Sequence, residues 1–144
     1  MSDPRTACEL CGQDAAPAVW RDDDWRVVRV ADAAFPAFYR VISRAHVREM
    51  SQLSRPARHR AIDLVCAVER VLIERLQPTK VNLASLGNVV PHLHWHVIAR
   101  FDEDSHFPQP IWGAKQREDG DAAGRLALDL DRLDDAVREA LRAA

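Results

Sequence analysis

Three histidines alternate with apolar residues in the run HLHWHVI over residues 92–98. If this run is a strand, His92, His94 and His96 share one face of a sheet, roughly 7 Å apart from one to the next, and the apolar residues share the other face. Three imidazoles on one face can bind a metal, or one can act as a nucleophile while its neighbours bind the charge of a substrate. Unrelated surface histidines would not leave the opposite face wholly apolar. We therefore predict a functional site here.

The residues just before this run favour phosphate chemistry over metal binding. Gly87 and Asn88 predict a tight turn whose backbone N–H groups can hold an anion. The amide of Asn88 lies within reach of the same position. No carboxylate alternates with the histidines on their face, so no mixed histidine–carboxylate metal site is indicated locally. The pattern favours nucleophilic attack on a phosphate.

A long helix is expected to pack against the apolar face of this strand. Ser54 can cap it, Pro56 suits its first turn and Pro78 ends it. Apolar residues between them recur at spacings of three and four, which gives the helix one apolar face. A tail helix is expected from about Asp129, on the same kind of spacing.

The remaining segments predict strands. Residues 25–30 and 37–43 have strand composition, and the aspartates at 22–24 predict a hairpin turn before them. Residues 80–85 and 91–100 are expected to form two more strands, the second carrying the histidines. Together with the helices they predict an α+β domain with a largely antiparallel sheet.

Length and charge narrow the class of protein. A chain of 144 residues fits one domain, 1–144. The net charge of −2, from 20 basic and 22 acidic residues, gives no support to binding of nucleic acid or anionic membranes. No segment has the character of a signal peptide or a membrane span, so a cytoplasmic location is expected.

An early pair of cysteines, Cys8 and Cys11, has the spacing of half a tetrahedral zinc site. The same pair could be two reduced thiols or a redox pair. No thioredoxin-like strand and helix accompany it, which argues against the redox interpretation.

The histidine run resembles the signature of the histidine triad (HIT) superfamily. The resemblance covers most of residues 8–112 and includes the cysteine pair, a strand ending near His46, the long helix and the Gly-Asn turn. It implies a HIT-like fold with a core at about 8–112 and a C-terminal extension at 113–144. It also implies a homodimer with a continuous sheet, and action on the α-phosphate of a purine nucleotide such as a nucleoside phosphoramidate, a dinucleoside polyphosphate or a nucleotidyl sugar.

The same resemblance implies a role for each site residue. His94 is the expected nucleophile, forming a nucleotidyl-histidine that water hydrolyses, and imidazole with its ordinary pKa of about 6.5 is neutral enough for this near pH 7. Its Nδ1–H needs an acceptor, and a main-chain carbonyl is expected. His96 is expected to stabilise the phosphoryl charge. Asn88 stands where the family usually has glutamine, and Gly87 and Ser85 complete the expected substrate-binding set. This chemistry needs no metal.

Several relatives of this type hold a structural zinc with two cysteines and two histidines. The matching residues are Cys8, Cys11, His46 and His92, which would tie the N-terminal arm to the sheet and leave His92 outside the reaction. The alternative is a pair of empty thiols, with His46 hydrogen-bonded to the triad.

Departures from the family leave other functions open. Val89 stands where a Ser or Thr is common, so one hydroxyl is missing. A nucleotidyltransferase, or a nucleotide-binding regulator with little turnover, remains an alternative to the hydrolase. A barrel using the three histidines as metal ligands ranks last, because it would have no long helix. Arg40 and Arg44 are candidates to meet a polyphosphate, and Trp112 is expected over the cleft, against a dimer partner or in ordinary packing.

Overall fold

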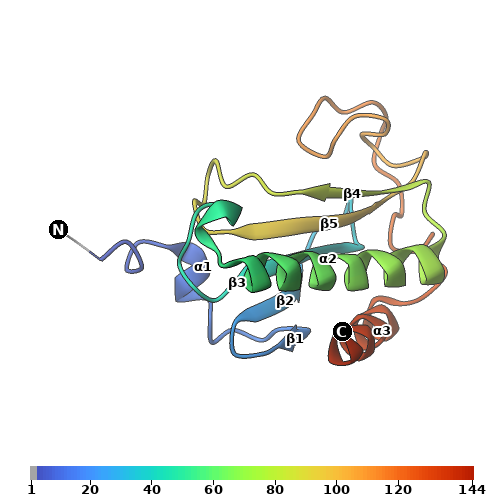
Figure 1. Cartoon of the computed structure of the whole chain (residues 1–144). Helices are drawn as coiled ribbons and strands as arrows, with labels where there is room; N and C mark the ends of the chain where they lie inside the picture. Colours follow the sequence, from blue (N-terminus) through green and yellow to red (C-terminus); the bar gives the residue numbers. More distant parts are fainter. Residues whose placement is uncertain (1–2) are drawn as a thin grey trace.

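The computed structural model describes residues 3–144 and has a five-stranded antiparallel sheet at its centre (Figure 1). The strands follow the spatial order β1-β2-β3-β5-β4, so β3 and β5 are central and β4 lies at one edge. Their bounds are β1 Trp20–Arg21, β2 Trp25–Arg29, β3 Phe38–Ser43, β4 Lys80–Ala84 and β5 His94–Arg100. The predicted α+β fold with an antiparallel sheet is confirmed.

The predicted long helix is α2, Arg55–Leu76, which crosses one face of the sheet. The Ser54 hydroxyl accepts a hydrogen bond from the N–H of Ala57 and so caps the first turn. Gln77 closes the helix in a left-handed conformation, with φ of 49°. Pro78 follows, and its ring prevents further helical hydrogen bonding.

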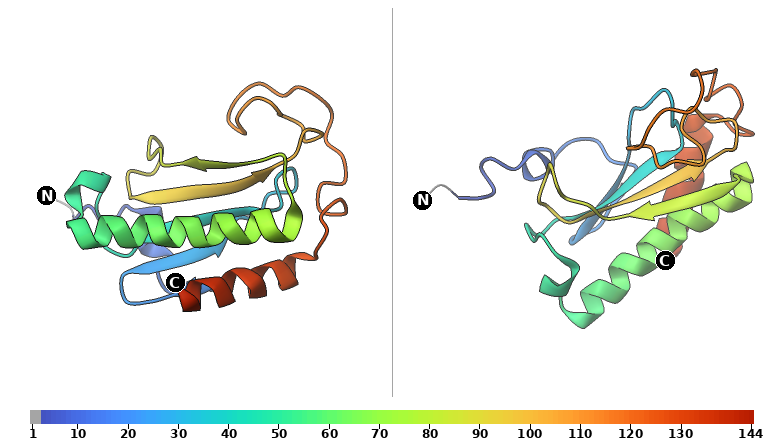
Figure 2. Two further views of the ribbon diagram at one scale, coloured as in Figure 1. Left: turned by 45° about the vertical axis from the view of Figure 1, so that its right-hand side comes forward. Right: turned by 90° about the horizontal axis from the view of Figure 1, so that it is seen from above.

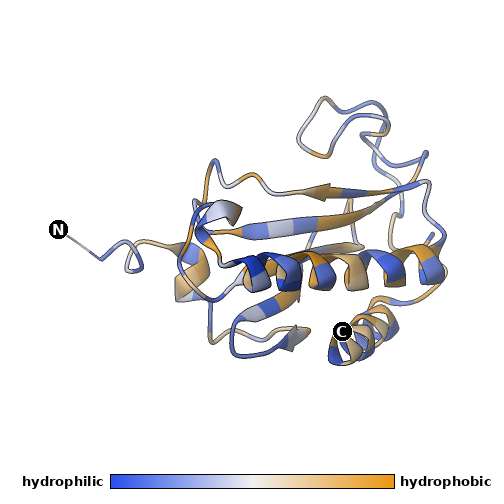
Figure 3. Ribbon diagram, in the orientation of Figure 1, coloured by the Kyte–Doolittle hydropathy of each residue, from blue (hydrophilic) through white to orange (hydrophobic). Residues whose placement is uncertain are grey.

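The core lies between the sheet and the helices. Leu93, Val97 and Ala99 are buried with the inner face of α2, as the alternation of the histidine run predicted. The tail helix is α3, Leu130–Ala143, capped by Asp129, and it lies beside α2 (Figure 2). Figure 3 shows polar and apolar residues alternating along α2 and α3, and apolar residues in the second half of β5.

Three short features differ from the expected elements. β5 begins at His94 and not at residue 91, because Pro91 has no N–H to donate and the N–H of His92 bonds to the carbonyl of Val90. A short helix, α1 at Glu9–Gly12, was not predicted; it contains Cys11, and Cys8 is its N-cap residue. A 3-10 turn, η1 at Met50–Gln52, precedes α2. Within residues 3–144, no helix is both long enough and apolar enough to cross a membrane.

Candidate active site and metal cluster

A cavity of about 460 Å³ opens on the sheet face opposite α2. Its floor comes from β3 and β5, where Arg40 lies directly across from His96 in the strand register. The volume is within the usual range for small-molecule sites. The residues lining it are Glu9, Leu10, Arg40, Leu86, Gly87, Asn88, Val89, Val90, His94, His96 and Trp112.

His94 is fixed by a backbone hydrogen bond. Its Nδ1 donates to the carbonyl of His92 at 2.6 Å, which is the main-chain acceptor that nucleophilic use of the other nitrogen requires. Because Nδ1 carries the proton in this arrangement, Nε2 of the neutral ring keeps its lone pair. Burial lowers the pKa of His94 and outweighs the hydrogen bond to the His92 carbonyl, which raises it; the charge of Arg40 lowers the pKa further, so the neutral ring is favoured.

His96 lies beside His94, with ring centroids 4.8 Å apart. Burial, helped by the neighbouring His94 and Arg40, lowers the pKa of His96 to about 4. Two buried nitrogens in this region have no hydrogen-bond partner among the described residues, Nδ1 of His96 and Nε of Arg40. Buried polar groups usually have partners, so two unsatisfied donors or acceptors at one cavity are typical of a place where a ligand binds.

The Gly-Asn turn forms one wall of the cavity. Gly87 has φ of +78°, which side-chain-bearing residues rarely adopt, and this explains the glycine. Asn88 lines the cavity as expected, and Val89 follows it with 93% of its surface exposed. Ser85, expected to bind substrate, is not among the residues that line the cavity, and its hydroxyl donates to the carbonyl of His94 at 2.9 Å. Ser85 therefore supports the backbone of the site.

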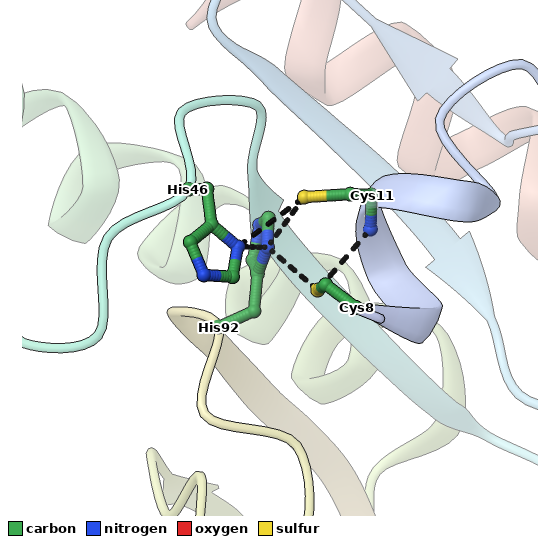
Figure 4. A group of neighbouring side chains, drawn as sticks. All are labelled: Cys8, Cys11, His46 and His92. Atoms are coloured by element: carbon green, nitrogen blue, oxygen red, sulfur yellow. Dashed lines mark hydrogen bonds between the residues drawn. The ribbon is translucent and has the colours of Figure 1, made fainter. Parts of the chain in front are cut away.

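A second cluster of side chains lies beside this site. It brings four potential ligand atoms within 4.8 Å of one another, from Cys8, Cys11, His46 and His92 (Figure 4). Nδ1 of His92 lies 3.4 Å from Sγ of Cys8 and 3.2 Å from Nδ1 of His46, and Sγ of Cys11 lies 3.3 Å from Nδ1 of His46. A tetrahedron with zinc bonds of roughly 2.0–2.3 Å has edges of about 3.5 Å. The cluster fits a tetrahedral metal ion, and both thiols are free.

Comparison with known proteins decides the family. The family model of the HIT domain matches residues 12–103. The chain belongs to the HIT family. No curated protein matches it.

Solved structures of HIT proteins share the whole fold. A histidine triad protein from Bradyrhizobium japonicum is 28% identical, with a TM-score of 0.70 over 87% of this chain and 90% of its own. One from Marinobacter aquaeolei is 23% identical, with a TM-score of 0.71 over 94% of this chain and 97% of its own. A zinc-bound histidine triad family protein from Mycobacterium smegmatis is 18% identical, with a TM-score of 0.61 over 96% of each chain.

The three histidines of this HIT chain do not all face the cavity. His92 is 1% exposed and turns toward the cysteines, and its Nε2 donates to the carbonyl of Ser43. Its Nδ1 therefore keeps a lone pair for the cluster. The cause is local: the chain leaves β3 after Ser43 and returns at Val47, whose carbonyl accepts from the N–H of Leu93, and this loop brings His46 beside His92.

The cysteines reach the cluster because α1 is held against the sheet. Arg26 is buried, donates to the carbonyl of Leu10 at 2.7 Å and lies 3.3 Å from Asp14. Burial raises the pKa of the Cys11 thiol, and Cys8 raises it further, while the charges of Arg5 and Arg26 act in the opposite direction.

Some cavity residues were not predicted. The apolar Leu10 and Leu86 carry no sequence signal that separates them from ordinary packing residues. Trp112, for which three placements were open, lies on the cavity with its ring 5.0 Å from that of His96. Arg44 does not line the cavity; it lies 3.5 Å from Asp14.

Proposed function

We propose that this HIT chain is a nucleotide phosphohydrolase that acts at the α-phosphate of a nucleoside phosphoramidate or dinucleoside polyphosphate. The observation that carries the proposal is the hydrogen bond from Nδ1 of His94 to the carbonyl of His92 at the floor of an open cavity. A histidine held in one tautomer, buried and with a lowered pKa, has the properties of a nucleophile in covalent catalysis.

The reaction has two displacements at phosphorus. Nε2 of His94 attacks the α-phosphorus and the bond to the leaving group breaks, with its electron pair departing on the leaving group. Water then attacks the nucleotidyl-histidine, the P–N bond to His94 breaks, and a nucleoside monophosphate is released. The ring of His94 returns to its neutral state and can begin another cycle.

The surroundings of His94 support the charge changes. Arg40 supplies a cation on the strand next to His96, directly opposite it in the register, and the Gly87 turn lines the same cavity. Groups of this kind, fixed before the reaction, stabilise the charge that develops on the phosphoryl oxygens. Ser85, through the carbonyl of His94, holds the strand end from which His94 projects.

We propose that the cluster of Cys8, Cys11, His46 and His92 holds one structural zinc. Its support is the near-tetrahedral spacing of two thiols and two imidazoles, the preferred donors of zinc, together with the zinc in the related protein from Mycobacterium smegmatis. Zinc here would tie α1 to the sheet. The four donors fill a tetrahedral shell, so this ion leaves no open position for substrate.

We also propose that two copies pair along β4. This strand is an edge of the sheet, and Leu83 on it is 41% exposed. An uncovered edge strand with an apolar side chain is a ready site for pairing with another strand. Sedimentation equilibrium measures whether the chain forms a dimer, and a monomer at micromolar concentration would contradict the proposed pairing.

A substrate panel tests the proposed reaction. The protein is incubated with adenosine and guanosine phosphoramidates and dinucleoside polyphosphates, with and without a chelator, alongside His94→Ala. We expect turnover that survives brief chelation and disappears in His94→Ala. Tight nucleotide binding without turnover on any substrate would favour the regulator, and transfer of the nucleotidyl group to an added phosphate would favour the transferase.

A further inference from the structure

Three exposed apolar side chains line the cavity, and we call Leu86, Val89 and Trp112 the apolar rim. Their exposed fractions are 51%, 93% and 50%, and all three line the cavity. The polar groups His94, His96 and Arg40 lie on its floor. A substrate whose phosphate reaches the floor can place its next substituent against this rim.

Trp112 is held at the rim by a loop built on a buried ion pair. Arg100, at the end of β5, is 1% exposed and binds Asp104 through two hydrogen bonds of 2.8 and 3.0 Å. The carboxylate of Asp104 also accepts the N–H groups of Phe101, His106 and Phe107.

The same guanidinium reaches further along the loop. Arg100 donates to the carbonyl of Gln109 at 2.8 Å, three residues before Trp112. Gly113 then closes a turn onto the carbonyl of Pro110. The indole is therefore positioned before any ligand arrives, and pre-positioned aromatic surface costs little entropy to use in binding.

The charge of the cavity argues against a polyphosphate at the rim. Among residues 3–144, the charged residues that line it are one cation, Arg40, and one carboxylate, Glu9. Arg44 is paired with Asp14, and Arg48 lines a neighbouring cavity that shares Glu9, Val89 and Val90 with this one. The α-phosphate can use Arg40, but each further phosphate would add negative charge beside apolar side chains, and no second cation among the described residues lines this cavity to offset its desolvation.

We infer that the apolar rim, and Trp112 above all, selects a nucleoside 5′-phosphate whose leaving group is an uncharged apolar amine. This inference rests on the proposed function and names its substrate class. As Nε2 of His94 bonds to phosphorus, the P–N bond to the amine breaks. The amine departs with that electron pair and takes a proton from water, and a second water releases the monophosphate. Trp112 is thus a specificity-determining residue.

The test compares two substrates that differ only in the leaving group, adenosine 5′-phosphoramidate and its N-benzyl derivative. We expect kcat/KM for the benzyl compound to be higher in the wild type, and Trp112→Ala to reduce the ratio of the two values about tenfold. The intrinsic reactivities of the compounds cancel when ratios are compared between variants. Trp112→Phe should keep most of the preference.

The matched control is Ile73→Ala. This variant removes an exposed apolar side chain, 49% exposed on α2, that does not line the cavity, and it should leave the ratio unchanged. A ratio unaffected by Trp112→Ala would overturn the inference. So would a higher kcat/KM for diadenosine tetraphosphate than for the benzyl compound. A loss in Trp112→Ala that depends on the base and not on the amine would place the nucleobase at the rim instead.

A binding measurement separates this inference from the proposed function. In His94→Ala the two phosphoramidates stay intact, so calorimetry gives their dissociation constants, with and without Trp112→Ala. We expect about tenfold tighter binding of the benzyl compound, lost when Trp112 is removed. Equal dissociation constants, or no binding of either compound, would overturn the inference even if turnover is found. Turnover lacking in the wild type with the binding preference present would contradict only the proposed reaction.

Discussion

Replacing Asp104 with asparagine tests whether the loop that carries Trp112 depends on the buried ion pair. The substitution preserves shape but removes the negative charge from a side chain that is 4% exposed and accepts five hydrogen bonds. Burial alone would raise the pKa of Asp104, but Arg100 and the three backbone N–H groups outweigh it and lower the pKa, so the native site favours the carboxylate. In the variant the charge of Arg100 stays buried without its counter-charge.

The expected loss follows from that uncompensated charge. Removing one partner of a buried pair typically costs about 3–5 kcal/mol in the free energy of unfolding. With a urea m-value of roughly 2 kcal/mol/M, the midpoint of unfolding should fall by about 1.5–2.5 M. The assay is urea unfolding followed by circular dichroism and by tryptophan fluorescence.

Asp102→Asn is the matched control. It makes the same chemical change two residues away, at an exposed aspartate whose carboxylate has no hydrogen bond or ion pair among the described residues. It should shift the free energy of unfolding by no more than about 0.5 kcal/mol. An Asp104→Asn variant as stable as this control would refute the role given to the ion pair.

The other predictions concern the turn, the pH profile and the metal. Gly87→Ala places a side chain at φ of +78° and should lower the free energy of unfolding by about 1–2 kcal/mol. The control is Gly12→Ala, whose added carbon meets nothing within 4 Å and which should leave the free energy of unfolding nearly unchanged. Equal urea midpoints for the two variants would contradict this prediction. The pKa values of His94 and His96 are lowered, that of His96 to about 4, so the neutral rings are lost only as the pH falls through those values. The acid limb of kcat/KM should therefore lie below pH 6.5, and a midpoint at or above 6.5 would be inconsistent with the burial of both rings. Prolonged chelation, or Cys11→Ser, should release bound zinc and lower the melting temperature by about 5 °C or more. The control variant Cys66→Ala should keep the metal content of the wild type. Zinc retained in Cys11→Ser would argue against the cluster as the zinc site.

Much of the fold could be predicted because local patterns and tertiary contacts agree. Ser54, Pro56 and Pro78 mark the ends of α2 through capping and backbone geometry that act within a few residues. The alternation after His94 predicts which side of β5 meets α2, because a strand places neighbours on opposite faces.

Features held by distant residues could not be predicted in this way. The helix α1 has four residues, too few to be stable alone, and Arg26 on β2 holds it in place. The position of Trp112 depends on the ion pair between Arg100 and Asp104, which no periodicity encodes. The turn of His92 away from the cavity depends on its hydrogen bond to the carbonyl of Ser43 and on the path of the loop between Ser43 and Val47. Only the resemblance to HIT proteins implied a separate role for His92.

The claim that His94 is the nucleophile can be tested by finding the covalent intermediate. The protein is mixed with an excess of an adenosine phosphoramidate, quenched in alkaline denaturant, in which a P–N bond to histidine is stable, and mapped by peptide mass spectrometry. We predict an added adenylyl group on the peptide that contains His94, attached to that ring, and none in His94→Ala. Turnover that persists in His94→Ala, or an adenylyl group on another residue, would contradict the account.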